Sequence, residues 1–404
     1  MFPKNFLWGA TTSSHQIEGS NFNNDWWEWE QKGRTKDPSG DACRSYTLYE
    51  KDFDLAQQLN HNAHRLSIEW SRIEPAEGKI NQEELRHYKK VIAVLKARGI
   101  EPIVTVHHFT NPGWFSYLGG WLNDRAHKYF SFFIDTLTEC FKDDVRYWIT
   151  INEPMVLAWH SYHLGVWPPG EKSFLKMWRA LNNMLKAHNI AYQKIHKVYQ
   201  KRTAIKPMVG IATNLRPFYV CPKTNNMPVH VGVFFRHRMY NMYSLDKIKR
   251  HMDFIGVNYY EGEYNSSDPE LKLPYFGGNC TYLHGHNPHA NQLGWHFDPN
   301  GLYETMKWLK KYKRPIFITE NGTCEEDDSW RIKFIDEHLK RVEKAIAEGI
   351  NVIGYLHWSL LDNFEWHHGF APRFGLIEVD YKTYERRIKP SALHLARIIK
   401  AGKV

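Results

Sequence analysis

Short apolar runs rich in β-branched and aromatic residues alternate with longer amphipathic stretches along the whole chain. The runs are 7–14, 64–70, 102–109, 147–152, 208–215, 253–260, 315–319 and 352–358. Most of them are continuous rather than alternating in hydrophobicity, which is typical of parallel strands that are covered on both faces. The pattern therefore predicts eight buried parallel strands.

Two of the intervening stretches carry clear helical signals. Residues 328–348 place apolar side chains at three- and four-residue spacings, with Asp327 and Asp328 as candidate N-caps and Gly349 as a C-terminal stop. Residues 82–98 repeat the same pattern. A strand followed by a helix, repeated eight times, predicts an α/β fold, a (β/α)8 TIM barrel.

A single domain over residues 1–404 is expected. No Ser/Gly linker, block of like charge or low-complexity tract divides the chain, and one large barrel fits its length. We interpret 261–300, rich in Gly, Asn, His and Pro, as an extended loop after the sixth strand. In such barrels the loops at the C-terminal strand ends form the walls of the active site.

The chain carries a formal net charge of +9, which raises the question of a nucleic-acid partner. Such binding needs basic residues clustered on one face. Here Lys and Arg are interleaved with Glu and Asp along 82–98 and 331–348, so we predict solvated helix faces and no nucleic-acid partner.

The cysteines and the termini bear on the cellular compartment. The five cysteines are odd in number, widely separated and without a CxxC pair, so we expect reduced thiols and no cysteine zinc site. They are Cys43, Cys140, Cys221, Cys280 and Cys324. The first residues lack a signal-peptide core, and no apolar run approaches about 18 residues. We therefore expect no transmembrane segment and a cytoplasmic location.

Two glutamates stand at the ends of predicted strands. Glu153 follows the fourth strand in WITINEP, and Glu320 follows the seventh in IFITENG. Each is succeeded by a chain-breaking residue, Pro154 or Gly322. Either alone is more often a helix cap or a surface charge. As a pair at one barrel mouth, they are what glycoside cleavage requires: one acid protonates the leaving oxygen, and the other attacks the anomeric carbon or activates water.

The chain resembles glycoside hydrolase family 1, the β-glucosidase/β-galactosidase family, in seven segments that keep the family order. The segments are FLWGATTSSHQIEG (6–19), HRLSIEWSRIEP (64–75), VTVHHFTNPGWF (104–115), INEP (151–154), DFIGVNYY (253–260), ITENG (318–322) and HWSLLDNFEWHHGFAPRFGLIEVDY (357–381). They run almost end to end and are most similar to the shorter archaeal-type β-glycosidases.

The resemblance implies a retaining, exo-acting β-glycosidase that works through a covalent glycosyl-enzyme. Its substrates would be small-molecule β-glycosides or oligosaccharides with a terminal non-reducing β-D-glucosyl residue, or a related β-D-galactosyl residue. Transglycosylation is left open, as are the preferred sugar, the aglycone and the assembly of the chain into a homo-oligomer.

Four residues are assigned catalytic roles by the resemblance: Glu153 as acid/base, Glu320 as nucleophile, and Arg65 and Tyr260 as groups flanking the nucleophile. A cation and a hydroxyl donor beside Glu320 would lower its pKa, whereas burial and the charge of Glu320 would raise the pKa of Glu153. Retention requires carboxyl groups about 5–5.5 Å apart, against about 6.5–9.5 Å for inversion.

The resemblance also implies a set of substrate-binding residues. Asn152 matches the residue that binds the sugar 2-hydroxyl, and Trp358 matches the aromatic platform under the ring. Phe109 stands where the family commonly has Trp, and its ring has no N–H to donate to a 3-hydroxyl. The full set is Gln16, His108, Asn152, Asn258, Trp358, Glu365 and Trp366.

Two other classes of function are weighed against this hypothesis. A metal hydrolase could use His107–His108 and His367–His368, but no HExxH motif occurs, and we predict no metal or organic cofactor. A sugar-binding protein on an inactive barrel would lack a catalytic glutamate, and both are present. Within the family, the carboxylate of Glu365 would repel a 6-phosphate, so an unphosphorylated sugar is favoured.

Overall fold

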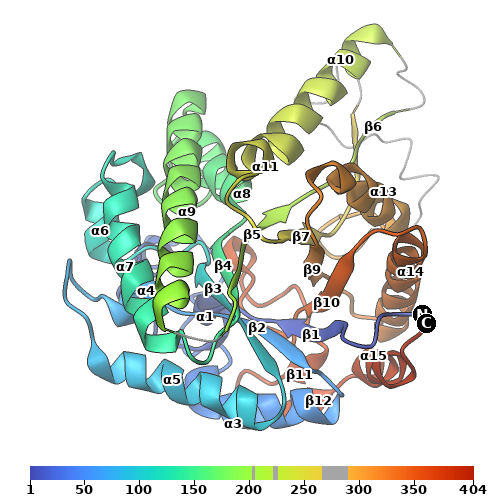
Figure 1. Ribbon diagram of the computed structural model, residues 1–404, viewed down its shortest axis with the longest axis horizontal. Helices are drawn as coiled ribbons and strands as arrows, with labels where there is room; N and C mark the ends of the chain where they lie inside the picture. Colours follow the sequence, from blue (N-terminus) through green and yellow to red (C-terminus); the bar gives the residue numbers. More distant parts are fainter. Residues whose placement is uncertain (203–204, 222–225, 266–289) are drawn as a thin grey trace.

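The protein folds as a closed barrel of eight parallel strands surrounded by helices, as seen in the computed structural model in Figure 1. The structure describes residues 1–202, 205–221, 226–265 and 290–404. The strands neighbour one another in the order β1-β10-β9-β7-β5-β4-β3-β2, which confirms the predicted TIM barrel. They are β1 Leu7–Thr11, β2 Ala63–Ser67, β3 Glu101–His107, β4 Tyr147–Asn152, β5 Met208–Asn214, β7 Ile255–Tyr259, β9 Ile316–Asn321 and β10 Val352–Trp358.

Each predicted apolar run overlaps one barrel strand, but some bounds differ. β1 ends at Thr11 because Ser14 begins the short helix α1 (Ser14–Ile17). β2 ends at Ser67, two residues before Glu69 caps α4 (Trp70–Ile73). β9 continues through Asn321, so Glu320 lies inside its strand and not after it.

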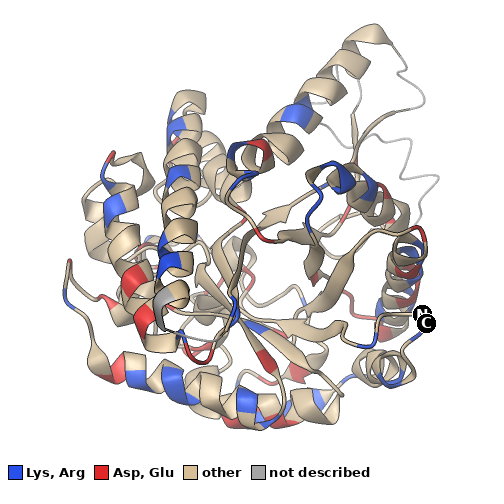
Figure 2. Cartoon of the chain, viewed as in Figure 1, with Lys and Arg blue, Asp and Glu red and all other residues tan. Residues whose placement is uncertain are grey.

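The outer layer consists of one main helix after each barrel strand (Figure 1). These helices are α3 Ser45–Gln58, α5 Gln82–Ala97, α7 Ala126–Phe141, α9 Phe174–Arg202, α11 Tyr243–Ile248, α13 Pro299–Leu309, α14 Asp328–Ala347 and α15 Pro390–Ala401. The two helices with strong sequence signals, α5 and α14, are confirmed, and the Asp327 side chain accepts from Ser329 N as an N-cap. Figure 2 shows basic and acidic positions interspersed along α14, whereas the acidic positions of α5, Glu83 and Glu84, lie in its first turn and basic positions follow them.

A cluster of apolar side chains from neighbouring strands fills the inside of the barrel. The rings of Tyr147, Phe254 and Phe317 lie with centroids 6.0–6.3 Å apart. Ala63, Ile103, Ile149, Ala212 and Leu356 complete the cluster. The barrel is therefore a packed support, and the groups at its C-terminal end rest on a rigid base.

Smaller elements extend the loops at the barrel ends. Two short two-stranded sheets, β6 (Phe218–Val220) with β8 (Glu263–Asn265) and β11 (Ile377–Val379) with β12 (Arg386–Ile388), have no counterpart in the predicted pattern. Helix α10 (Met227–Arg236) extends away from the barrel at the upper right of Figure 1. The predicted loop 261–300 contains β8 and the start of α13, and residues 266–289 lie outside the described part.

The expectation of reduced cysteines is wrong at one position. Cys43, Cys140 and Cys324 are free, but Cys221 is disulfide-bonded. Spacing along the sequence does not reveal a pair that only folding brings together, and Cys280 is not among the described residues. Over the described residues, every helix is either too short or too polar to span a lipid bilayer.

Candidate active site

A cavity of about 480 Å³ opens where the C-terminal ends of the barrel strands meet. Its walls include residues at or just after the ends of β3, β4, β5, β7, β9 and β10. Eight of the eleven predicted site residues line it: His108, Asn152, Glu153, Tyr260, Glu320, Trp358, Glu365 and Trp366. The other three, Gln16, Arg65 and Asn258, hydrogen-bond to members of that group from behind the cavity wall.

Glu153 begins the short helix α8 (Pro154–Ala158) directly after β4. Its backbone is in the left-handed region, with φ 44°, and its N–H donates to the Ala212 carbonyl at 2.7 Å. Its carboxylate Oε1 accepts from Asn258 Nδ2 at 2.8 Å. Burial, reinforced by the charge of Glu320, raises the pKa of Glu153 to about 8, so this carboxyl group holds its proton at neutral pH.

Glu320 is only 3% exposed and has a different set of partners. Arg65 Nη1 forms an ion pair with Oε1, and Tyr260 Oη donates to Oε2 at 2.5 Å. Burial raises the pKa of Glu320 above its usual value, while Arg65 and Tyr260 act in the opposite direction. The predicted net lowering is therefore wrong, because desolvation outweighs the two donors. The donors still favour the carboxylate form of Glu320 over that of Glu153.

Asn258 connects the two carboxyl groups. It is the ladder neighbour of Glu320 in the β7–β9 pairing, and its Nδ2 donates to both Glu153 and Asn152. Its Oδ1 in turn accepts from Thr319 Oγ1 at 2.7 Å, which fixes the orientation of the amide. The two acids are thereby held on either side of one amide.

Asn152 is oriented so that its amide oxygen is bonded within the protein and its amide nitrogen can donate to a bound sugar. Its Oδ1 accepts from Arg65 Nη2 at 2.6 Å and from Asn258 Nδ2 at 3.1 Å. Its Nδ2 lies 3.3 Å from His108 Nε2. Burial and the charge of Arg65 lower the pKa of His108 well below 6.5, so this imidazole is neutral.

Gln16 and Glu365 meet at one side of the cavity. Gln16 Nε2 donates to Glu365 Oε2 at 3.4 Å and to the Phe364 carbonyl at 2.8 Å. Burial and the charges of Glu320 and Glu153 raise the pKa of Glu365 to about 8. Gln16 Oε1 accepts from Ser13 Oγ at 2.6 Å and Gln16 is 0% exposed, so within this pair it is the Glu365 carboxyl group that lines the cavity and Gln16 that orients it.

Aromatic rings face the polar groups across the cavity. The His108 imidazole is nearly parallel to the rings of Trp358 and Trp366, at 6.0 and 6.1 Å between centroids. The Trp358 backbone also approaches Gly322 closely: a Cβ at Gly322 would lie 1.9 Å from the Trp358 carbonyl oxygen. Only glycine fits there, two residues after Glu320.

The sequence reasoning missed several groups in the cavity wall. Arg216 stacks over the Tyr240 ring at 5.4 Å and lies 3.6 Å from Glu261. Burial raises the pKa of Glu261 to about 7, and Trp295 packs on Tyr260 at 5.1 Å. Arg216 follows the end of β5 by two residues, so the rule used for the glutamates, a charged residue at a strand end, could have found it.

The histidine pairs weighed as metal ligands have other partners. His107 Nε2 pairs with Asn111 Oδ1 at 3.0 Å, and His367 Nδ1 accepts from Trp167 Nε1 at 3.0 Å. In the described part of the chain, no group of three or more His, Cys, Asp or Glu side chains is arranged to hold a metal ion. Phe109 lines the cavity and packs on Trp167 and Trp366.

A (β/α)8 barrel with two buried glutamates facing one cavity is the arrangement expected of a glycoside hydrolase. A family model described as glycosyl hydrolase family 1 matches residues 1–236 and 235–404, and the chain belongs to this family. It is a glycoside hydrolase of the β-glucosidase/β-galactosidase type.

Characterised relatives are similar over essentially their whole length. Beta-glucosidase A of Thermotoga maritima is 32% identical, covering 99% of this chain and 98% of that protein. A beta-galactosidase of Pyrococcus woesei is 30% identical, covering 100% and 97%. Among solved structures, a beta-glycosidase from Pyrococcus horikoshii is 38% identical with a TM-score of 0.91, covering 100% of this chain and 96% of that one. A Thermotoga maritima beta-glucosidase in complex with glucoimidazole is 31% identical, with a TM-score of 0.90 and coverage of 100% and 99%.

Proposed function

We propose that this enzyme is a retaining, exo-acting β-glycosidase, with Glu320 as nucleophile and Glu153 as acid/base. The observation that carries the proposal is the unequal environment of two carboxyl groups in one cavity. Glu320 is paired with a guanidinium and a phenol, whereas Glu153 accepts from a neutral amide and has its pKa raised to about 8. A retaining glycosidase needs this asymmetry.

In the first step, a carboxylate oxygen of Glu320 attacks the anomeric carbon, and the bond from that carbon to the aglycone oxygen breaks. The carboxyl proton of Glu153 passes to the departing oxygen. Glu320 becomes an ester of the sugar, and its negative charge is lost. Arg65 and Tyr260 stabilise the carboxylate before attack and when it is released again.

In the second step, Glu153 acts as a base. With the Glu320 charge gone, the main neighbouring repulsion on Glu153 is removed, and its pKa falls. The ionised carboxylate takes a proton from water, whose oxygen attacks the anomeric carbon and displaces Glu320. The two inversions leave the β configuration unchanged. A sugar hydroxyl in place of water would give transglycosylation.

The remaining predicted residues bind the terminal β-D-glucosyl or β-D-galactosyl unit in this proposal. Asn152 Nδ2 is the donor to the 2-hydroxyl, since its oxygen is already occupied by Arg65 and Asn258. Gln16, His108, Glu365 and Trp366 bind the outer hydroxyls, and Trp358 supports the ring. The single-domain organisation and the cytoplasmic location stay predictions from the sequence.

Azide rescue tests the two roles separately. Glu320→Gly should hydrolyse an aryl β-glucoside at least about 10³-fold more slowly, because the attacking atom is gone. Added azide should occupy the vacated space and yield the α-glucosyl azide. Glu153→Gly should instead give the β-glucosyl azide, since azide then attacks the glycosyl-enzyme from the opposite face.

NMR identifies the anomer in each case, and it also shows whether the wild-type enzyme first releases the β sugar. Exchanged azide products would reverse the assignment of the two residues. Release of the α sugar by the wild-type enzyme would contradict retention.

A further inference from the structure

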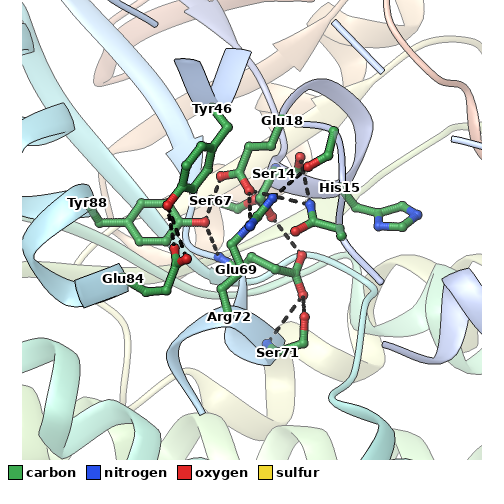
Figure 3. Close-up of polar contacts among 12 residues, drawn as sticks. Ser14, His15, Glu18, Tyr46, Ser67, Glu69, Ser71, Arg72, Glu84 and Tyr88 are labelled. Carbon is green, nitrogen blue, oxygen red and sulfur yellow. Dashed lines mark hydrogen bonds and ion pairs between the residues drawn. The ribbon is translucent and has the colours of Figure 1, made fainter. Parts of the chain in front are cut away.

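A buried carboxylate outside the cavity joins the two chain segments that carry Gln16 and His108. Glu69 lies two residues after β2, caps α4 and is 0% exposed. Figure 3 shows it among the side chains of Ser14, Ser67 and Ser71. Neither its burial nor its position two residues beyond a strand is explained by the reaction itself.

Its contacts reach across both segments. Ser14 Oγ donates to Glu69 Oε2 at 3.0 Å, and Ser14 is two residues before Gln16 in α1. Thr110 Oγ1 donates to Oε2 at 3.0 Å and lies 3.1 Å from Oε1; Thr110 is two residues after His108. One carboxylate therefore accepts from two segments that are far apart in the sequence, the start of α1 and the loop after β3.

Glu69 is itself held in place by further hydrogen bonds, to residues of α4 and α5. Its backbone N–H donates to Tyr88 Oη at 3.1 Å, and Tyr88 Oη donates to Glu18 Oε1 at 2.7 Å. Glu18 Oε2 accepts from Arg72 Nε at 3.0 Å, and Ser71 Oγ donates to Glu69 Oε1 at 2.7 Å. Figure 3 shows this set of contacts around Glu69. The carboxylate has little freedom to follow a loop that shifts.

We propose that Glu69 is a positioning residue of the sugar site, which holds Gln16 and His108 at a fixed separation so that both meet the same sugar ring. The inference rests on the proposed function, in which these two side chains bind outer hydroxyls. Binding groups contribute to rate only when they are held within a fraction of an ångström of the productive geometry. A shared acceptor achieves this for two loops at once.

Glu69→Gln tests the proposal with little change in size. The variant replaces one acceptor oxygen with an NH₂ group, which has no lone pair for a hydroxyl donor. The measurement is kcat and KM for an aryl β-glucoside and for its 2-, 3-, 4- and 6-deoxy analogues. We expect kcat/KM of the parent glucoside to fall about tenfold, and the penalty for removing a hydroxyl bound by Gln16 or His108 to shrink by a similar factor. If Glu69 had a purely structural role, Glu69→Gln would lower kcat/KM by the same factor for all five substrates.

Two variants that each lack one hydroxyl test the two segments independently. They also test the proposal if Glu69→Gln does not fold. Ser14→Ala releases only the Gln16 segment, and Thr110→Val releases only the His108 segment. Each should reduce the penalty for a different sugar hydroxyl. If both variants left every deoxy penalty at its wild-type value, the proposal would be overturned.

Glu74 provides a matched control. It is 1% exposed and follows the same helix α4, and its carboxylate accepts from Trp70 Nε1 at 2.8 Å and Gly78 N at 2.9 Å, neither of which belongs to the segment that carries Gln16 or His108. Glu74→Gln should leave the pattern of deoxy penalties unchanged. An equal change in both variants would overturn the positioning role while the glycosidase function stands. A wild-type enzyme that turned over none of the glycosides would overturn the proposed function itself.

Discussion

The inner and outer parts of the cavity are built in different ways. The inner part is bordered by buried polar side chains such as Asn152, at the end of β4, with Arg65 and Asn258 hydrogen-bonded behind it; each of the three is at most 1% exposed. The outer wall includes Leu164 and Val166, which are 38% and 41% exposed. It is formed largely by two helical segments, η2 (Trp159–Leu164) and η4 (His237–Met242).

This difference indicates that the inner part and the outer wall of the cavity have different roles. Strand ends are fixed by the barrel ladder, and buried polar groups there tolerate little displacement before a donor or acceptor is left unpaired. The helical segments at the rim offer partly exposed apolar side chains such as Leu164, whose contacts make little directional demand. We therefore expect the inner part to decide sugar identity and rate, and the outer wall to modulate affinity for the aglycone.

Removing the inner cation should have the largest effect. Arg65→Met deletes the partner of buried Glu320 and a donor to Asn152. We expect kcat to fall by about 10³-fold or more, and the free energy of unfolding to fall by about 3–5 kcal/mol, because a buried charge loses its counterion. Steady-state kinetics and urea denaturation at neutral pH measure the two effects. Activity within tenfold of wild type would show that the inner network is not needed for the reaction.

The pH profile should show the next largest effect. Because burial raises the pKa of Glu153 to about 8, the acid is protonated below that pH, and kcat/KM for an alkyl β-glucoside should fall about tenfold per pH unit above it. A dinitrophenyl β-glucoside needs no proton on its leaving group, so its profile should lose this limb. Since the pKa of Glu365 is also raised to about 8, Glu365→Gln is the control. If the wild-type enzyme showed the limb with both substrates and Glu365→Gln removed it, the limb would belong to Glu365.

A change in the outer wall should have the smallest effect. Leu164→Ser removes apolar contact at the rim, and we expect KM for an aryl β-glucoside to rise about threefold, with methyl β-glucoside unaffected. Leu175→Ser is the control, because Leu175 is 80% exposed and is not a lining residue. A large fall in kcat with Leu164→Ser would contradict the division between rim and interior.

The sequence predicted the inner part well for a physical reason. Parallel strands end at one barrel edge, so residues such as Glu153 and Tyr260 converge wherever the loops go. The outer wall depends on helices and loops with no such geometric constraint, and no pattern in the sequence singles out Tyr240 or Trp295. The sign of the Glu320 pKa shift was also missed, since it depends on how much desolvation opposes Arg65, and burial is a property of the fold.

The backbone at Glu153 has a consequence for how this protein evolves. With φ 44°, the position costs an L-residue roughly 1–2 kcal/mol that glycine would not incur. Glycine would therefore relieve this backbone cost, but in the proposed mechanism it would also remove the acid/base. Stability and turnover thus place opposite demands on this one residue.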